Sequence, residues 1–223
     1  MGMRSALFGS AVVSLCAGAH GQWSDDPFVN LAVADRPGEQ VLPLIGLRAD
    51  GGAFVSWFDH ASGNYDVYAQ RLAPDGTELW PHNGVLVSGE PSLSSLVGYD
   101  MIADSAGGCV IVFTDARDGT DRDIFAYRLD ENGNHLWGAT GVTLSSNADF
   151  EANPSVTENS DGDVFVFWRR YGAGANAGMF MQKLSPAGAK LFGADGIRVG
   201  MPGEVPAFQR GVVDADGAVV LSY

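Results

Sequence analysis

Short apolar runs separated by turn glycines make up most of the chain. Four segments, residues 50–57, 106–113, 161–168 and 216–223, share one pattern: a glycine in second place, a β-rich run, and an aromatic residue six positions after the glycine. Runs of this length between turn residues predict β-strands. Their regular spacing predicts an internal repeat of about 55 residues. The glycines are 56, 55 and 55 residues apart: Gly51, Gly107, Gly162 and Gly217.

A second strand-like segment follows each of the first three runs. Residues 66–72, 123–129 and 178–184 alternate in character, which suits a strand with two different faces. Each is followed by a glycine turn and by two bulky residues, Leu-Trp or Leu-Phe, which we call the bulky pair. A second glycine and a short strand come next. We expect the aromatic member of each pair to fill the space between neighbouring repeats: Trp80, Trp137 and Phe192.

Four short strands per repeat predict the fold class. Asp75-Gly76 and Asn132-Gly133 supply tight hairpin turns, and the 30 glycines argue against long helices. We therefore predict an all-β chain, a β-propeller-like array of four-stranded antiparallel repeats in about 3.5 copies. The repeats lie near residues 40–95, 96–150 and 151–205, with a partial copy at 206–223. Two alternatives stay open: four blades, the last completed by an N-terminal strand at residues 28–33, or an incomplete propeller.

The N-terminus predicts export. Residues 1–21 combine a short start carrying Arg4, an apolar stretch too short to span a bilayer, and small residues at its end, which is typical of a secretory signal peptide. The mature domain would be residues 22–223, in which Cys109 is the single cysteine and a small core residue. We expect no transmembrane segment and a secreted, periplasmic or cell-surface location in a bacterium.

The motifs of the repeat resemble those of a known group of proteins. Asp-Val/Ile-Tyr/Phe-Ala-Gln/Tyr-Arg-Leu at residues 66–72 and 123–129, then Leu-Trp and Gly-Val, is similar to repeats of bacterial secreted and surface proteins. The resemblance covers residues 40–223. It implies the propeller-type architecture and brings no activity with it.

Charge narrows the choice of partners. The chain has 27 acidic and 13 basic side chains and a net charge of −14, which becomes −15 when Arg4 leaves with the signal peptide. Such a surface repels phosphate backbones, so we expect no nucleic acid partner. A glycan or another surface protein is the expected partner, and the strand edge at Tyr223 is a candidate for self-association.

Charged residues in the loops after the second strand of each repeat are the candidate ligand-binding residues. In a propeller these loops gather on one face around the axis. An anion or sugar could be held by two arginines, with an aspartate as acid or base, and solvated loop charge is the alternative explanation. The candidates are Asp59, His60, Asp115, Arg117, Arg169 and Arg170.

Acidic residues in the loops between repeats suggest one weak candidate for a cofactor. A ring of carboxylates near the axis could hold calcium, although general acidity explains the same residues. We predict no other cofactor. The acids are Glu39, Glu90, Asp149, Glu151 and Glu204.

Two functional hypotheses follow. The first is an exported non-catalytic scaffold or binding protein, because the repeat is regular and no catalytic motif is present. The alternative is a carbohydrate-binding or carbohydrate-active protein with its site on the loop face. Whether the protein is an enzyme is left open, and the first hypothesis favours the absence of enzyme activity.

Overall fold

The structure is a computed structural model, and it describes residues 24, 26, 28–90, 98–117, 121–172, 176–201, 210–214 and 218–222. The predicted signal peptide at residues 1–21, Glu204 and Tyr223 lie outside these residues, so export and self-association at Tyr223 stay predictions. Within the described ranges, no helix has the length and apolar character needed to cross a membrane.

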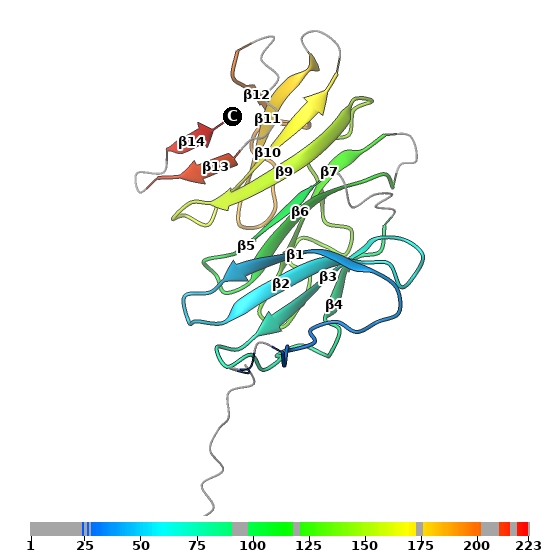
Figure 1. Cartoon of the computed structure of the whole chain (residues 1–223). Coiled ribbons are helices and arrows are strands. Elements are labelled where there is room, and N and C mark those ends of the chain that lie inside the picture. Colours follow the sequence, from blue (N-terminus) through cyan, green and yellow to red (C-terminus); the bar gives the residue numbers. More distant parts are fainter. Residues whose placement is uncertain are drawn as a thin grey trace, which may run out of the picture.

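The described strands form four antiparallel sheets in chain order, which we call blades 1 to 4 (Figure 1). Blade 1 contains β1 (Gln40–Leu47), β2 (Ala53–Asp59), β3 (Asp66–Leu72) and β4 (Val85–Ser88). Blade 2 contains β5 (Tyr99–Ala103), β6 (Cys109–Asp115), β7 (Asp123–Leu129) and β8 (Val142–Thr143). Blade 3 contains β9 (Phe150–Glu158), β10 (Val164–Tyr171), β11 (Gly178–Leu184) and β12 (Ile197–Val199). Blade 4 contains β13 (Arg210–Val213) and β14 (Val219–Ser222). The predicted all-β, propeller-like array is confirmed.

The first strand of every blade lies innermost. β1 packs beside β5, β5 beside β9, and β9 beside β13, so these four strands surround a common axis. Within each of the first three blades the remaining strands follow outward in sequence order. Residues of these innermost strands that occupy the same position of the repeat are therefore brought together at the axis.

The core lies between the blades. All seven residues of β6 are buried, and their side chains alternate between two faces. Cys109, Ile111 and Phe113 pack toward blade 1, whereas Val110 and Val112 pack toward blade 3. Blade 2 is thus covered on both faces, and Cys109 is a core residue as predicted.

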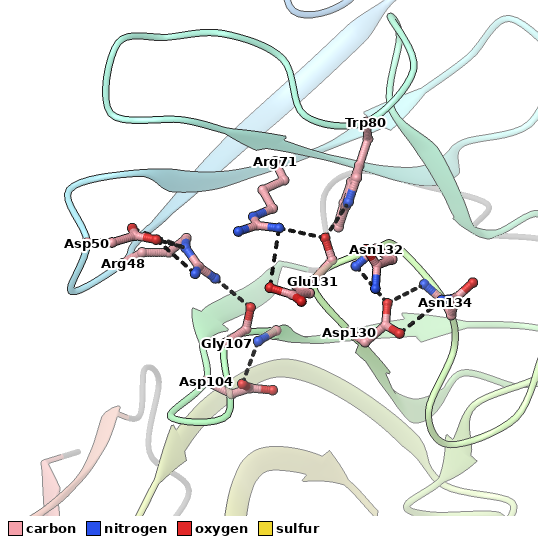
Figure 2. A network of polar contacts seen from close by, with 11 residues as sticks. Arg48, Asp50, Arg71, Trp80, Asp104, Gly107, Asp130, Glu131, Asn132 and Asn134 are labelled. Atoms are coloured by element: carbon pink, nitrogen blue, oxygen red, sulfur yellow. Dashed lines mark hydrogen bonds and ion pairs between the residues drawn. The ribbon is translucent and has the colours of Figure 1, made fainter.

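The tryptophans of the bulky pairs lie between blades, as expected. Trp80 Nε1 donates to the backbone oxygen of Glu131 (3.0 Å), to which Arg71 Nη1 also donates (2.8 Å) (Figure 2). Trp137 Nε1 makes the equivalent bond to Pro186 O (3.1 Å). Each Trp therefore packs against the next blade and also bonds to its hairpin turn.

Glycine is required in the turn that receives Trp137. Gly188 has φ +83°, in the left-handed region, and a Cβ there would lie 2.7 Å from Trp137 Cδ1. A side chain would therefore be strained and would displace the indole. The turn glycine makes the close contact between blades 2 and 3.

The N-terminal segment differs from the prediction. Residues 28–33 form a turn and irregular chain rather than a strand, so they do not complete blade 4. The chain instead runs beside blade 1, where Asp35 N donates to Asn83 Oδ1 (2.8 Å) and Arg36 stacks on Tyr68. The alternative of a fourth blade completed by residues 28–33 is wrong because these residues form no strand, and the chain that follows them is held against blade 1.

Candidate functional site

The six residues predicted to bind a ligand all lie at one end of the blades. This end, which we call the loop face, is where β2, β6 and β10 end and where β1, β5 and β9 begin. The antiparallel register places the end of β2 beside the start of β1, with Asp59 opposite Gln40. The three loops are thus on one face, and the surroundings of each residue decide whether its charge is available.

Asp59 and His60 stabilise their own loop. Asp59 is 1% exposed, and its carboxylate accepts from Ala61 N (2.9 Å) and Trp57 Nε1 (3.4 Å). The His60 ring lies 4.8 Å from that of Tyr65. The Asp59 carboxylate caps the turn after β2.

Asp115 and Arg117 pair with each other. Arg117 Nε lies 3.0 Å from Asp115 Oδ1, and its Nη2 donates to Tyr127 Oη (2.9 Å). The guanidinium also lies 3.6 Å from the centroid of Phe125. Burial raises the pKa of Asp115, while the hydrogen bonds of Arg117 lower it. The pair closes the loop after β6.

Arg169 and Arg170 are separated by the alternation of β10. Arg170 is 8% exposed; its Nε donates to Glu151 Oε1 (2.8 Å) and its guanidinium lies 3.8 Å from the centroid of Phe180. Arg169 points the other way and stacks on Tyr171 at 4.2 Å. The structure therefore places the predicted arginine pair on opposite faces of β10, with Arg170 buried and Arg169 partly exposed.

The backbone takes the left-handed conformation at the same place of the repeat in each of the first three blades, and in β1 and β9 it forms a bulge there. Leu42, Gly98 and Asn153 have φ of 52°, 69° and 54°, and each lies nine positions before the turn glycine of its repeat (51 − 42 = 107 − 98 = 162 − 153). The sheet register shifts at the first and third of these points. Left-handed backbone at Leu and Asn is costly, and such bulges re-aim the residues that follow.

The residues seven positions before the turn glycine of each repeat line a single cavity of about 490 Å³ at the axis. They differ from blade to blade in a way that the repeat does not require. We call this ring, together with Asn153, the axial mouth. Its four members are Leu44, Asp100, Ser155 and Arg210.

Asp100 is the acid of the axial mouth. Its Oδ2 accepts from Val156 N (3.0 Å) and lies 3.6 Å from Arg210 Nη1. Burial raises the pKa of Asp100, against the lowering effect of backbone hydrogen bonds from Val156 and Met101. A carboxylate held half-buried next to an exposed arginine is typical of a functional site.

Ser155 adds an unused polar group. Its side chain is 4% exposed, and its Oγ has no hydrogen-bond partner within the described part of the chain. Ser155 lines the 490 Å³ cavity and a neighbouring one of about 240 Å³, which Asn153, Asp100 and Arg210 also line. A buried hydroxyl without a partner favours a polar ligand at this place.

The opposite end of the axis also has a cavity, of about 510 Å³. The charged side chains that line it pair with one another or with Arg128. Arg48 binds Asp50 (2.9 Å) and donates to Gly107 O, as Figure 2 shows. Asp104 accepts from Arg128 Nε at 2.8 Å. The two ion pairs lie within blades 1 and 2, the bond from Arg48 to Gly107 O joins these blades, and we assign all three a structural role.

Sequence reasoning named the loop face and missed the axial mouth. Asp100, Ser155 and Arg210 lie in strands, whereas the residues predicted from the sequence lie in or beside loops. Comparing the residues seven positions before Gly51, Gly107, Gly162 and Gly217 would have found them, because one position holds Leu, Asp, Ser and Arg in turn.

The calcium site stays a prediction. Among the described residues, no group of three or more His, Cys, Asp or Glu side chains has a geometry that could hold a metal. Glu39 Oε2 accepts from Tyr65 Oη (3.1 Å), and Glu151 is the buried partner of Arg170.

Comparison with known proteins gives the fold. No family model and no curated protein sequence matches the chain. A protein of unknown function from Dyadobacter fermentans has a similar structure, with a TM-score of 0.50 and 14% identity over 85% of this chain and 58% of that one. An alpha-L-arabinanase from Penicillium chrysogenum gives 0.48 and 13% over 80% and 55%, and an endo-arabinase from Bacteroides thetaiotaomicron gives 0.42 and 13% over 81% and 68%. This chain thus spans little more than half the length of the Dyadobacter and Penicillium proteins, and its likeness to the Dyadobacter protein is one of fold.

Proposed function

We propose that the axial mouth binds a carbohydrate. The proposal rests on one observation: the same position of the repeat holds Asp100, Ser155 and Arg210, and these three residues line one cavity. Of the two hypotheses drawn from the sequence, the carbohydrate one is therefore the better supported. The non-catalytic scaffold stays a prediction, as does export.

The chemistry of the ring suits a ligand rich in hydroxyl groups. Asp100 accepts hydrogen bonds, the Arg210 guanidinium donates them, and the Ser155 hydroxyl does either. A sugar presents donors and acceptors at close spacing, whereas an apolar ligand would leave Ser155 unpaired, at a cost of about 1–3 kcal/mol. The cavity of about 490 Å³ falls within the range of small-molecule sites.

Binding is proposed in preference to hydrolysis. Glycoside hydrolysis generally uses two carboxyl groups on either side of the scissile bond. Among the described residues that line the two cavities of the axial mouth, Asp100 supplies the carboxylate. A hydrolytic role, the second candidate, requires a second acid and is tested in the same experiment.

Calorimetric titration of the purified chain with a panel of neutral oligosaccharides tests the proposal. We expect at least one to bind and Asp100→Asn to weaken it about 10- to 100-fold, as expected for loss of a hydrogen bond to a charged group. Asp75→Asn, in the hairpin turn at the far end of blade 1, is the matched control. Unchanged affinity in Asp100→Asn contradicts the proposal. Release of reducing sugar that Asp100→Asn abolishes supports hydrolysis.

A further inference from the structure

Two aromatic side chains lie side by side at the loop-face end of blade 3. Phe150 begins β9 and Tyr171 ends β10, the two are paired in the sheet, and their ring centroids are 5.1 Å apart. Tyr171 is 41% exposed. Arginines stand at both sides, with Arg122 5.7 Å from the Phe150 centroid and Arg169 4.2 Å from that of Tyr171. We call these four residues the aromatic platform.

Among the described residues, the arginines of the platform have no acidic partner, in a chain where acids outnumber bases 27 to 13. Six other arginines have a carboxylate within 4 Å: Arg48, Arg71, Arg117, Arg128, Arg170 and Arg210.

Within the described part of the chain, neither Arg122 nor Arg169 has an ion pair or a side-chain hydrogen bond, and Arg169 Nε is buried without a partner. Arg36 also rests on a ring without an acid, but it stands alone on Tyr68 of blade 1. Two cations left available around one aromatic pair point to an anionic ligand.

We propose that the aromatic platform is an outer subsite for a sugar unit that carries a carboxylate, a uronate. This inference rests on the proposed function, because it takes the ligand to be a glycan. The two partly exposed rings, tilted by 49° to each other, offer apolar faces to a sugar ring. The planar guanidinium matches a carboxylate with two parallel hydrogen bonds, and it can stack on a ring at the same time.

The position of the platform fits a single glycan chain. Phe150 and Asn153 are both in β9, and three residues of strand cover about 10 Å, so the platform lies just outside the axial mouth. A glycan unit in the mouth would place a neighbouring unit over the rings. Aromatic residues with arginines also suit single-stranded nucleic acid, but a chain of net charge −14 repels a continuous run of phosphates. A glycan with one acidic unit has a single negative charge, so the chain repels it far less.

Matched pairs of oligosaccharides test the inference, each a neutral sugar and its counterpart bearing one uronate. Titration of the full chain should show the uronate form binding about tenfold more tightly, and Arg169→Gln should remove that difference while leaving the neutral sugar unchanged. Arg122→Gln should reduce the difference, and it provides a second variant if Arg169→Gln folds poorly. Arg36→Gln, at an arginine that stacks on Tyr68 of blade 1 away from the platform, is the control and should change nothing.

The outcomes separate the two proposals. Equal binding of both members of a pair, with loss in Asp100→Asn, overturns the subsite and leaves the axial mouth standing. A uronate preference that depends on Arg169 but not on Asp100 supports the subsite and contradicts the axial mouth. Absence of binding by any pair overturns both, and tighter binding of a single-stranded oligonucleotide than of any uronate sugar overturns the choice of glycan.

Discussion

Asp100 and Arg210 occupy the same position in two different repeats and face each other across the axis at 3.6 Å. Each lies seven residues before the turn glycine of its repeat (107 − 100 = 217 − 210). A packing role would be satisfied by similar residues at this position in every blade. The change from Leu44 to an acid, a hydroxyl and a cation therefore points to a ligand that lacks the symmetry of the fold.

The stability of the protein should rise when this acid is removed. Because burial raises the pKa of Asp100, its ionisation is easier in the unfolded chain, and it costs stability as pH rises through the unfolded and then the folded pKa. Asp100→Asn should therefore raise the melting temperature at pH 7 by about 1–4 °C. Below the unfolded pKa the wild-type carboxyl is protonated in both states, so the difference should shrink at pH 3. Thermal unfolding at both pH values measures it, and a lower melting temperature for Asp100→Asn at pH 7 contradicts the assignment.

The two neighbouring arginines of β10 should behave in opposite ways. Arg170→Ala leaves Glu151 buried without its cation and should cost about 3–5 kcal/mol of unfolding free energy. Arg169→Ala removes a partly buried side chain that has no ion pair among the described residues, so it should cost clearly less, about 1 kcal/mol or below, while weakening uronate binding. Urea denaturation compares the variants. Equal losses would mean that the alternation of β10 is assigned wrongly.

The indole N–H groups should contribute measurably to the contacts between blades. Trp80→Phe and Trp137→Phe each keep most of the ring and lose one hydrogen bond to the next blade, so each should cost about 1 kcal/mol beyond the change in packing. The third repeat already has Phe192 at this position. Denaturant unfolding checks the values, and no loss in either variant would mean that the bonds to Glu131 and Pro186 add nothing.

A pair of glycine substitutions separates backbone strain from crowding. Gly188 and Gly193 have φ of +83° and +75°, but a Cβ meets Trp137 only at Gly188 and meets nothing within 4 Å at Gly193. Gly193→Ala should cost about 1–2 kcal/mol from the left-handed backbone alone. Gly188→Ala should cost clearly more, because the indole must also move. Similar losses would show that the hairpin turn adapts without moving Trp137.

The fold was predictable from the sequence because the same pattern of residues recurs in each repeat. Turn glycines, alternating strands and a bulky pair recur at a fixed period, so Trp80 and Trp137 could be placed between blades without coordinates. The N-terminal segment has no second copy for comparison, and the prediction for residues 28–33 was wrong for that reason. Its position depends on contacts such as Asp35 with Asn83, which a strand-like composition does not reveal.

The candidate site was only partly accessible to sequence reasoning. The loops of Asp59, Asp115 and Arg169 were placed on one face, but an acid at a strand end caps a turn as readily as it binds a ligand, and burial decides between the two. Arg169 and Arg170 are adjacent in sequence and opposite in the sheet. The partner of each arginine becomes visible only when blades 2 and 3 are packed together.

Mapping of amide chemical shifts by NMR during titration with a bound oligosaccharide tests the central claim most directly. The account predicts that the largest changes occur at Asp100, Asn153, Ser155 and Arg210, and that Arg48, Asp50 and Glu158 at the opposite end of the axis stay unchanged. Shifts confined to the opposite end, or a titration that moves no amide of the axial mouth, would contradict it.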